Sequence, residues 1–399
     1  MDRIKELAKK YGTPAYLYNC NCIKARYSKL RECLGSEVDI YYSMKANPNK
    51  KIVKILADLG CGIEVASMGE IKIALDCGID ANRIIFAGPG KNEEELRFAV
   101  DKRIRMINVE SYDEMLSINN YAEELGIVVD VSLRINPDGL KNKSKIRMTG
   151  VSSQFGIDES KVDINFISKI KKLNNINISG IQVYMGTEIL DYQDIVNNTQ
   201  YTLNLAQSIS EELGIDLRFL DFGGGFGIPY FENEKELDLD KLGQSIKDLY
   251  DEYRTFIHGK KLAFESGRFL VADSGYYVVK VLYVKESKGK KYIICDGGSN
   301  FHAASAFLGR FVRSNFPIMT VPDNSQKEEM TVVGPLCTPT DVIGQNVLIN
   351  KEIKNGDYVV ILKSGAYGLT YSPTLFLNHE SPIEVMFNES GDDWIINGK

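Results

Sequence analysis

Three short segments carry side chains whose chemistry is unusual for their surroundings. Lys45 ends the apolar stretch IYYSMK, where burial would lower the pKa of its amine and free it to attack a carbonyl carbon. The glycine run 223–225 in LDFGGGFG bares backbone N–H groups that can approach an oxyanion. Glu265 and Arg268 stand three residues apart in FESGRF, and the planar fork of an arginine suits a phosphate. A flexible turn and a surface ion pair are the alternative interpretations of the last two segments.

Together, these segments predict pyridoxal phosphate (PLP). The protein must hold the aldehyde, the phosphate and the pyridine nitrogen of this cofactor at once. Lys45 would take the aldehyde as a Schiff base, and the glycine run and Arg268 would take the phosphate. Glu265 is then available for another part of the same ligand. A kinase interpretation of the letters DFG fails, because no HRD loop accompanies them.

The elements that must position these residues alternate between short apolar strands and amphipathic segments. The expected strands are 39–45, 62–66, 83–87, 105–109, 128–135, 178–185, 217–222 and 261–264. Eight strand–helix units in about 230 residues predict a parallel (β/α)8 TIM barrel, with a doubly wound open sheet as the main alternative. Barrel enzymes place their sites at the carboxyl ends of the strands. The residues expected at that face are Lys45, Glu64, Ser67, Gly88, Arg134, Gly186, Thr187, Gly223, Gly224, Gly225 and Glu265.

The sequence after Phe264 has a different pattern. Segments such as GYYVVKVLYVKE and DYVVILKSGAYG are strands broken by Gly, Asn and Asp, which predicts a mainly antiparallel β domain. The N-terminal strand in TPAYLYN is expected to pair into this domain. We therefore predict an α/β protein with a PLP-binding barrel over 36–266 and a β-rich domain made of 1–35 and 267–399.

The bulk composition argues against several classes of function. The chain has 399 residues, enough for two domains, and a net charge of −6, which argues against a nucleic-acid or membrane-surface role. Its seven cysteines lack CxxC spacing and its three histidines lack metal-ligand spacing, so we expect no disulfide framework and no metal site. With no signal core and no long apolar run, a cytoplasmic location is expected.

The motifs YYSMKAN, EVASMGEI, LRIN, DFGGGFG, ESGRF, GPLCTPTD and SGAYG occur in this order between about Pro14 and Tyr371. In this respect the chain resembles the fold-type III PLP-dependent decarboxylases, which include diaminopimelate, ornithine and arginine decarboxylases. The segments FAGPGKNEEEL and FHAASAFLGRFVRSNFP are similar to the subgroup of the BtrK decarboxylase of butirosin biosynthesis and the siderophore decarboxylases.

The resemblance implies roles for individual residues. Lys45 would be the Schiff-base lysine, and Glu265 would face the pyridine nitrogen and keep it protonated. Cys337 would donate a proton to the substrate carbon, with Asp341 nearby for substrate recognition. In such families the segment of these two residues enters the barrel of a partner chain, so a homodimer with shared sites is implied. The predicted cofactor contacts, from the resemblance or from their place at strand ends, are Lys45, Glu64, Arg134, Tyr184, Thr187, Gly223, Gly224, Gly225, Glu265, Arg268 and Tyr367.

Two departures from the family pattern bear on chemistry and substrate. Tyr184 stands where many members stack a histidine on the cofactor, and a phenol stays uncharged at the pH where an imidazole becomes cationic. Thr338 follows Cys337 where diaminopimelate and ornithine decarboxylases carry an acid for the distal amine. The resemblance with this departure indicates decarboxylation of a modified or carrier-tethered amino acid. Diaminopimelate decarboxylase is the alternative, and a non-catalytic regulatory binding protein is a further one.

The expected substrate contacts are Asp341, Thr338, His302 and Arg310. His302 and Arg310 could meet a carboxylate or a carrier phosphopantetheine, with ordinary surface charge as the alternative. The basic loop LKNKSKIR (residues 140–147) could dock an acidic acyl carrier protein, although such runs are usually solvated loops.

Overall fold

The computed structural model describes residues 1–138, 146–147, 152–231, 233–306 and 315–397. The chain forms two compact units. One, here the barrel unit, comprises residues 26–228 and 235–269, and the other, here the β unit, comprises 1–25, 229–234 and 270–399. The domain limits expected from the sequence stay a prediction.

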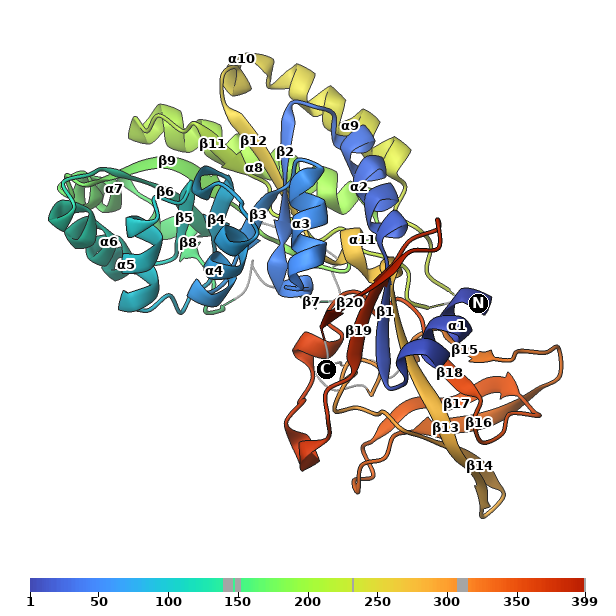
Figure 1. Cartoon of the computed structure of the whole chain (residues 1–399). Helices are drawn as coiled ribbons and strands as arrows, with labels where there is room; N and C mark the ends of the chain where they lie inside the picture. The colour runs from blue at the N-terminus through green and yellow to red at the C-terminus, as the bar shows by residue number, and fades with distance from the viewer. Residues whose placement is uncertain (139–145, 148–151, 232, 307–314, 398–399) are drawn as a thin grey trace. The chain divides into compact units, whose positions relative to one another are not determined.

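The barrel unit contains a closed ring of parallel strands (Figure 1). The strands are β2 (Val38–Ser43), β3 (Gly62–Val65), β4 (Ile84–Phe86), β5 (Met106–Val109), β6 (Val129–Asn136), β9 (Ile176–Gln182), β11 (Phe219–Asp221) and β12 (Lys261–Ser266). The ring closes where β12 pairs with β2 and where β5 pairs with β6, all in parallel register. The predicted TIM barrel is confirmed, and the open sheet is excluded because such a sheet has two unpaired edges.

Helices lie on the outside of the ring, where α3 to α10 fall between its strands, α2 precedes β2 and α11 follows β12 (Figure 1). Their bounds are α2 (Cys20–Leu34), α3 (Lys50–Asp58), α4 (Met68–Asp76), α5 (Glu93–Asp101), α6 (Tyr112–Glu124), α7 (Ile164–Ile170), α8 (Tyr192–Leu213), α9 (Leu239–Glu252), α10 (Arg254–Ile257) and α11 (Arg268–Val271). Short polar side chains start four of them by accepting a backbone N–H, namely Asn49, Ser67, Asn92 and Ser111. Each of these caps also ends the loop after a strand, so the caps fix the loops at the carboxyl face.

The β unit holds a mainly antiparallel sheet, as predicted. Its strands are β1 (Ala15–Asn19), β13 (Gly275–Ser287), β14 (Lys290–Cys295), β15 (Ile318–Val321), β16 (Lys327–Val333), β17 (Val342–Asn350), β18 (Tyr358–Ile361), β19 (Ile383–Phe387) and β20 (Asp393–Asn397). The N-terminal strand β1 lies between β13 and β19, which confirms the expected pairing.

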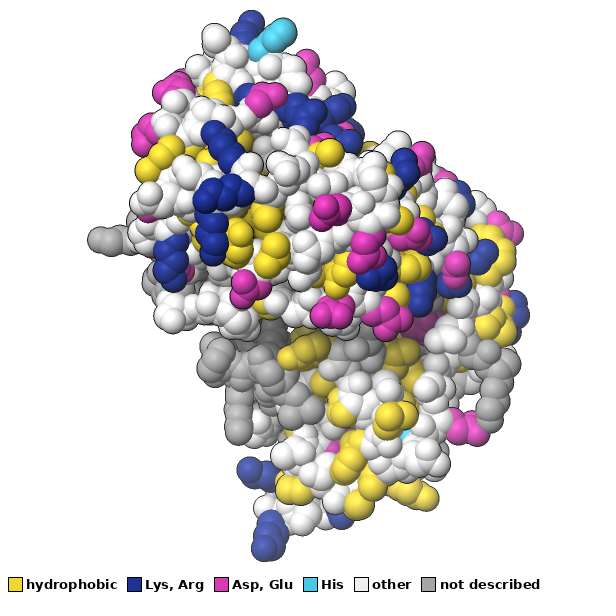
Figure 2. All heavy atoms as spheres, turned by 90° about the vertical axis from the view of Figure 1, so that its left-hand side faces the viewer, with side chains coloured by type: hydrophobic (Ala, Val, Ile, Leu, Met, Phe, Trp, Pro, Cys, Tyr) yellow, Lys and Arg dark blue, Asp and Glu magenta, His cyan; other side chains and the backbone are white. Residues whose placement is uncertain are grey.

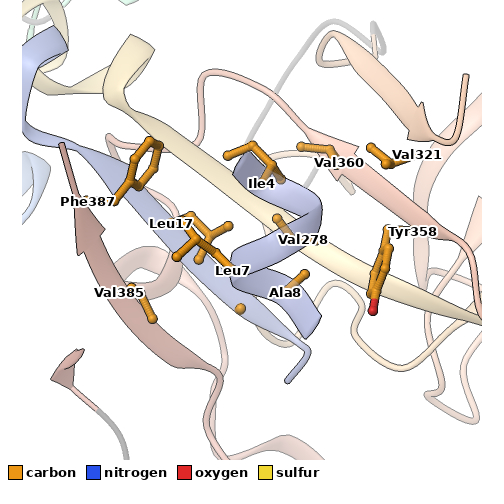
Figure 3. Close-up of a cluster of buried hydrophobic side chains, with 11 residues drawn as sticks. Ile4, Leu7, Ala8, Leu17, Val278, Val321, Tyr358, Val360, Val385 and Phe387 are labelled. Atoms are coloured by element: carbon orange, nitrogen blue, oxygen red, sulfur yellow. The ribbon is translucent and has the colours of Figure 1, made fainter. Parts of the chain in front are cut away.

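Helix α1 (Asp2–Tyr11) covers part of this sheet with its apolar face. Figure 3 shows Ile4, Leu7 and Ala8 of α1 in a buried cluster with side chains of the sheet. The sheet residues labelled there are Leu17, Val278, Val321, Tyr358, Val360, Val385 and Phe387. Burial of these apolar side chains stabilises the unit to which the segment with Cys337 and Asp341 belongs.

Basic and acidic side chains are interspersed on the face shown in Figure 2. Within the described part of the chain, no helix has the length and apolarity needed to span a bilayer. Among the same residues, no group of three His, Cys, Asp or Glu side chains is arranged to hold a metal ion.

Candidate active site

Lys45 lies just past the end of β2, in a single helical turn formed by Met44–Ala46. The turn carries the lysine out of the strand, so its side chain is 41% exposed instead of buried. Its Nζ lies 3.1 Å from Oε1 of Glu64, which is buried at the carboxyl-terminal half of β3. Glu64 Oε2 is also buried and accepts no hydrogen bond from any residue that the structure describes. The two predicted residues therefore meet, with the amine accessible and the carboxylate inside.

Three buried carboxyl groups belong to three strands of one part of the ring, in which β2 separates β3 from β12 and β11. They belong to Glu64, to Asp221 at the end of β11 and to Glu265 in β12. Burial, helped by the charge of Glu64 and opposed by that of Lys45, raises the pKa of Glu265 to about 7. Burial, together with the charge of Glu265, also raises the pKa of Asp221 well above its usual range. The two carboxyls therefore influence each other's protonation. The sequence reasoning missed Asp221, although its place before the glycine run was a usable signal.

The glycine run after β11 packs so closely that no side chain fits. A Cβ at Gly224 would lie 2.3 Å from the Glu265 carbonyl oxygen, and one at Gly225 would lie 2.4 Å from the Gly186 carbonyl oxygen. Gly223 and Gly225 also have φ values of 65° and 99°, where other residues are strained. The N–H of Gly223 donates to Asp221 Oδ1 at 2.9 Å, so within this structure that donor is already used. The run places bare backbone directly beside the buried carboxyls.

The loop after β9 brings Tyr184 and Thr187 to the same place. Lys45 Nζ lies 5.8 Å from the centre of the Tyr184 ring, which also borders Gly223. Thr187 is half-buried in the two-residue strand β10 (Gly186–Thr187). Arg268 begins α11, and its Nη2 lies 3.6 Å from Oε1 of Glu188, a residue that sequence reasoning did not single out. The structure thus gathers six predicted segments around one end of the barrel.

Arg134 near the end of β6 is buried and paired. Its Nη1 lies 2.7 Å from Oε1 of Glu110, the residue after β5. Lys91 and Glu114 form a second buried ion pair nearby, with 2.6 Å between Nζ and Oε1. None of Lys91, Glu110 and Glu114 was predicted as a site residue, because nothing in their spacing shows that they meet.

The β unit carries the residues predicted for substrate and proton transfer. Cys337 is exposed, and Thr338 is half-buried with its hydroxyl 2.9 Å from that of Thr340. Asp341 is buried instead, and its two carboxylate oxygens accept the N–H groups of Ser299 and Leu336 at 2.6 and 2.9 Å. In this structure Asp341 ties two loops together, one of them directly before Cys337.

His302 is fully buried, which argues against the predicted contact between its side chain and a substrate. The N–H of Ser305 donates to Nδ1 at 3.1 Å, and Nε2 lies 3.0 Å from the Ser364 hydroxyl. Its ring stacks near Tyr277, with 5.5 Å between centres. These surroundings are those of a packed side chain rather than of a surface charge, and the substrate contact of His302 stays a prediction. Tyr367 is half-buried at a φ of 53°, while Arg310 and most of the basic loop 140–147 lie outside the described residues.

Comparison with known proteins identifies the family. Residues 20–272 match the family model described as "Pyridoxal-dependent decarboxylase, pyridoxal binding domain", which is more than half of the chain. The chain belongs to this family of PLP-dependent decarboxylases. The predicted fold-type III resemblance is thereby confirmed, and PLP is the cofactor.

Two relatives of this decarboxylase are named for tethered or modified substrates, and others are diaminopimelate decarboxylases. It is 41% identical over 389 residues to the L-glutamyl-[BtrI acyl-carrier protein] decarboxylase of Niallia circulans, covering 96% of this chain and 90% of that protein. It is 32% identical to the 2-[(L-alanin-3-ylcarbamoyl)methyl]-2-hydroxybutanedioate decarboxylase of Staphylococcus aureus, covering 95% of each. The crystal structure of the M. jannaschii diaminopimelate decarboxylase with L-lysine matches with a TM-score of 0.89 at 30% identity, covering 98% of this chain and 90% of that one.

The geometry of this decarboxylase fits PLP in two respects. The glycine run leaves backbone where any Cβ would collide, which suits close approach of a phosphate. Three buried carboxyls with Lys45 as a nearby amine make a site of excess negative charge, which suits the cationic ring of a protonated pyridine. The chemistry of these residues therefore fits the cofactor of the family.

Proposed function

We propose that this decarboxylase removes CO2 from an α-amino acid that is modified or tethered to a carrier protein. The observation that carries the proposal is the 41% identity, over almost the whole chain, to a decarboxylase of a glutamyl group on an acyl carrier protein. Thr338 supports it, because a neutral residue after Cys337 provides no charge for a distal ammonium group.

We propose that residues of the barrel unit hold the cofactor. Lys45 binds it covalently, the glycine run 223–225 lies against its phosphate with the N–H groups of Gly224 and Gly225 as donors, and Glu265 accepts a hydrogen bond from the protonated ring nitrogen. The phosphate has further donors in Thr187 and Arg268, Tyr184 covers the ring, and Tyr367 of the β unit is a further proposed donor, as the family resemblance implies. Bound in this way, PLP supplies an acceptor for the electron pair that stays behind when CO2 leaves. Glu265 is suited to its task because its carboxyl is shielded from water, so that a charge opposite to it interacts strongly.

We propose that Cys337 returns a proton to the carbon that has lost CO2. Its side chain is exposed on the β unit, and the tie between Asp341 and the N–H of Leu336 holds the backbone directly before it. Two copies of the chain would each contribute Cys337 to the barrel of the other, so the active form is a homodimer. Sedimentation of the purified protein tests this point, since a monomer with full activity would contradict it.

The substrate proposal is tested by CO2 release from three kinds of amino acid. Purified protein with PLP is given glutamyl-loaded acyl carrier protein, a citryl-diamino acid, and free meso-diaminopimelate at equal concentrations. We expect turnover on a tethered or citryl substrate to exceed that on free diaminopimelate by at least about tenfold. This is the effect expected when one charge-assisted hydrogen bond to the distal ammonium group is missing. Comparable turnover on free diaminopimelate would overturn the proposal.

Diaminopimelate decarboxylation is the second candidate, because a solved enzyme of that name shares 30% identity and nearly the whole fold. The variant Thr338→Asp separates the two. It restores an acid after Cys337, so turnover of diaminopimelate should rise if the proposed specificity is right. If the wild type already turns over diaminopimelate efficiently, the second candidate replaces the first.

A further inference from the structure

Glu110 joins three loops at the carboxyl end of the barrel. It directly follows β5, and its Oε1 accepts both Arg134 Nη1 at 2.7 Å and the N–H of Gly88 at 3.1 Å. Its Oε2 accepts the N–H of Gly156 at 2.8 Å. Gly88 follows β4, Arg134 lies near the end of β6, and Gly156 directly precedes β8 (Ile157–Asp158). One carboxylate therefore binds donors from three separate segments of the ring.

The backbone of Glu110 is itself held in place. Its N–H donates to Glu114 Oε2 at 2.8 Å, and the next residue, Ser111, caps α6. Lys91 Nζ lies 2.6 Å from Glu114 Oε1 and donates to the Gly88 carbonyl at 2.6 Å. The loops after β4 and β5 are thus linked through a buried ion pair, and Glu110 has little freedom to move away from Arg134.

Arg134 is placed for an electrostatic effect on the proposed cofactor site. Its guanidinium lies 4.8 Å from the centre of the Phe155 ring and is shielded from solvent. Its positive charge lowers the pKa of the Glu265 carboxyl, which burial otherwise raises. Glu110 is the carboxylate that pairs with this guanidinium, so it sets the direction in which the donor fork of Arg134 points.

We propose that Glu110 is a positioning residue for the cofactor site and acts through Arg134. It holds the guanidinium in one orientation and neutralises its charge on the side away from the ligand. This inference rests on the proposed function, because it places PLP beside the residues at this end of the barrel. It differs from a purely structural role, in which loss of Glu110 would loosen the loops without a specific link to Arg134.

The test measures PLP affinity by absorbance titration in five proteins, with no measurement of activity. They are the wild type, Glu110→Ala, Arg134→Ala, the double variant, and the control Glu124→Ala. Glu124 is a matched control because it also pairs with an arginine, Arg97, at 2.7 Å, but on the exposed surface. Circular dichroism establishes that each variant is folded. If Glu110→Ala does not fold, Glu110→Gln carries the test, because its amide keeps the volume but replaces one acceptor oxygen by a donor.

We expect the dissociation constant for PLP to rise at least about tenfold in Glu110→Ala, as for loss of a buried charge-assisted contact, and to stay within about twofold in Glu124→Ala. Because Glu110 acts through Arg134, the double variant should bind PLP as Arg134→Ala does. An equal loss from Glu110→Ala in both backgrounds would overturn the inference, as would wild-type affinity in Glu110→Ala. A wild type that binds no PLP would overturn the proposed function instead, and the inference with it.

Discussion

The buried pair of Lys91 and Glu114 predicts a large effect of a single substitution on stability. The lysine side chain is 2% exposed and the glutamate side chain 10% exposed, with 2.6 Å between Nζ and Oε1. Lys91→Met keeps the length of the aliphatic chain and removes only the charge and its donors. Glu114 is then left as a buried carboxylate, and the charge that held down its pKa against burial is gone.

Breaking one partner of a buried ion pair costs about 3–5 kcal/mol, because the other charge stays buried without compensation. The double variant Lys91→Met, Glu114→Gln removes both charges and should recover more than half of that loss. Its amide oxygen can still accept the N–H of Glu110, so the remaining hydrogen bond survives. The destabilisation caused by Lys91→Met should also become smaller at lower pH. In this variant the Glu114 carboxyl takes up a proton more readily in the folded than in the unfolded chain.

The assay is urea denaturation followed by circular dichroism and by tryptophan fluorescence. Lys50→Met is the control, because Lys50 and Asp76 pair at 2.9 Å with both side chains 60% exposed, and its midpoint should match the wild type. The reasoning is refuted if Lys91→Met unfolds at the midpoint of Lys50→Met, or if the double variant is no more stable than Lys91→Met.

Four further predictions concern the site and the β unit. Lys45→Ala should lose the visible absorbance of bound PLP and all CO2 release, and its urea midpoint should fall, because the buried carboxylate of Glu64 loses its ion-pair partner. Gly224→Ala should weaken PLP binding and cost about 1–3 kcal/mol in urea titrations, since its Cβ would collide with backbone, whereas Gly90→Ala has open space and should change neither. His302→Ala should lower the melting temperature with KM for substrate unchanged, because the ring is buried and hydrogen-bonded; a changed KM at wild-type stability would support the original substrate role. Protein prepared without cofactor should lose stability as pH rises from about 5 to about 7. Burial raises the pKa of Glu265 to about 7, so in this range the folded chain binds more protons than the unfolded one. Urea titrations at several pH values test this, and Glu265→Gln should make the stability depend less on pH.

The barrel was predictable from the sequence because each parallel strand is a short continuous apolar run. The predicted strands match the observed ones to within a few residues, and β12 extends to Ser266, two residues beyond its expected end. At Lys45 the apolar run misled the prediction. Met44 is fully buried, so the pattern continues past Ser43 although the strand has already ended there. Only the structure shows that the lysine has turned toward solvent.

Contacts between distant segments were not predictable in the same way. Glu110 meets Arg134 and Gly156, which are 24 and 46 residues away, and no periodicity records that meeting. The orientation of the Asp341 side chain was also not predictable from the sequence. The family resemblance implied a substrate contact, whereas in this structure the space beside Gly298 and Gly334 is filled by its carboxylate, which accepts backbone N–H groups. A motif gives the residue types of a site, whereas the direction of each side chain depends on what packs beside it.

The charges at the end of the barrel favour a ligand that carries both a phosphate and a cation. Glu64 is offset by Lys45, and Arg134 is offset by Glu110. Burial raises the pKa of both Asp221 and Glu265, because a negative charge on either carboxyl is shielded from water. A buried charge of this kind costs free energy unless a partner of opposite sign is supplied. The glycine run adjoining both residues supplies the complementary feature, since its backbone suits an anion. A molecule with an anionic group at one end and a cationic ring nitrogen at the other satisfies both, so binding energy for the cofactor comes in part from relief of this excess charge.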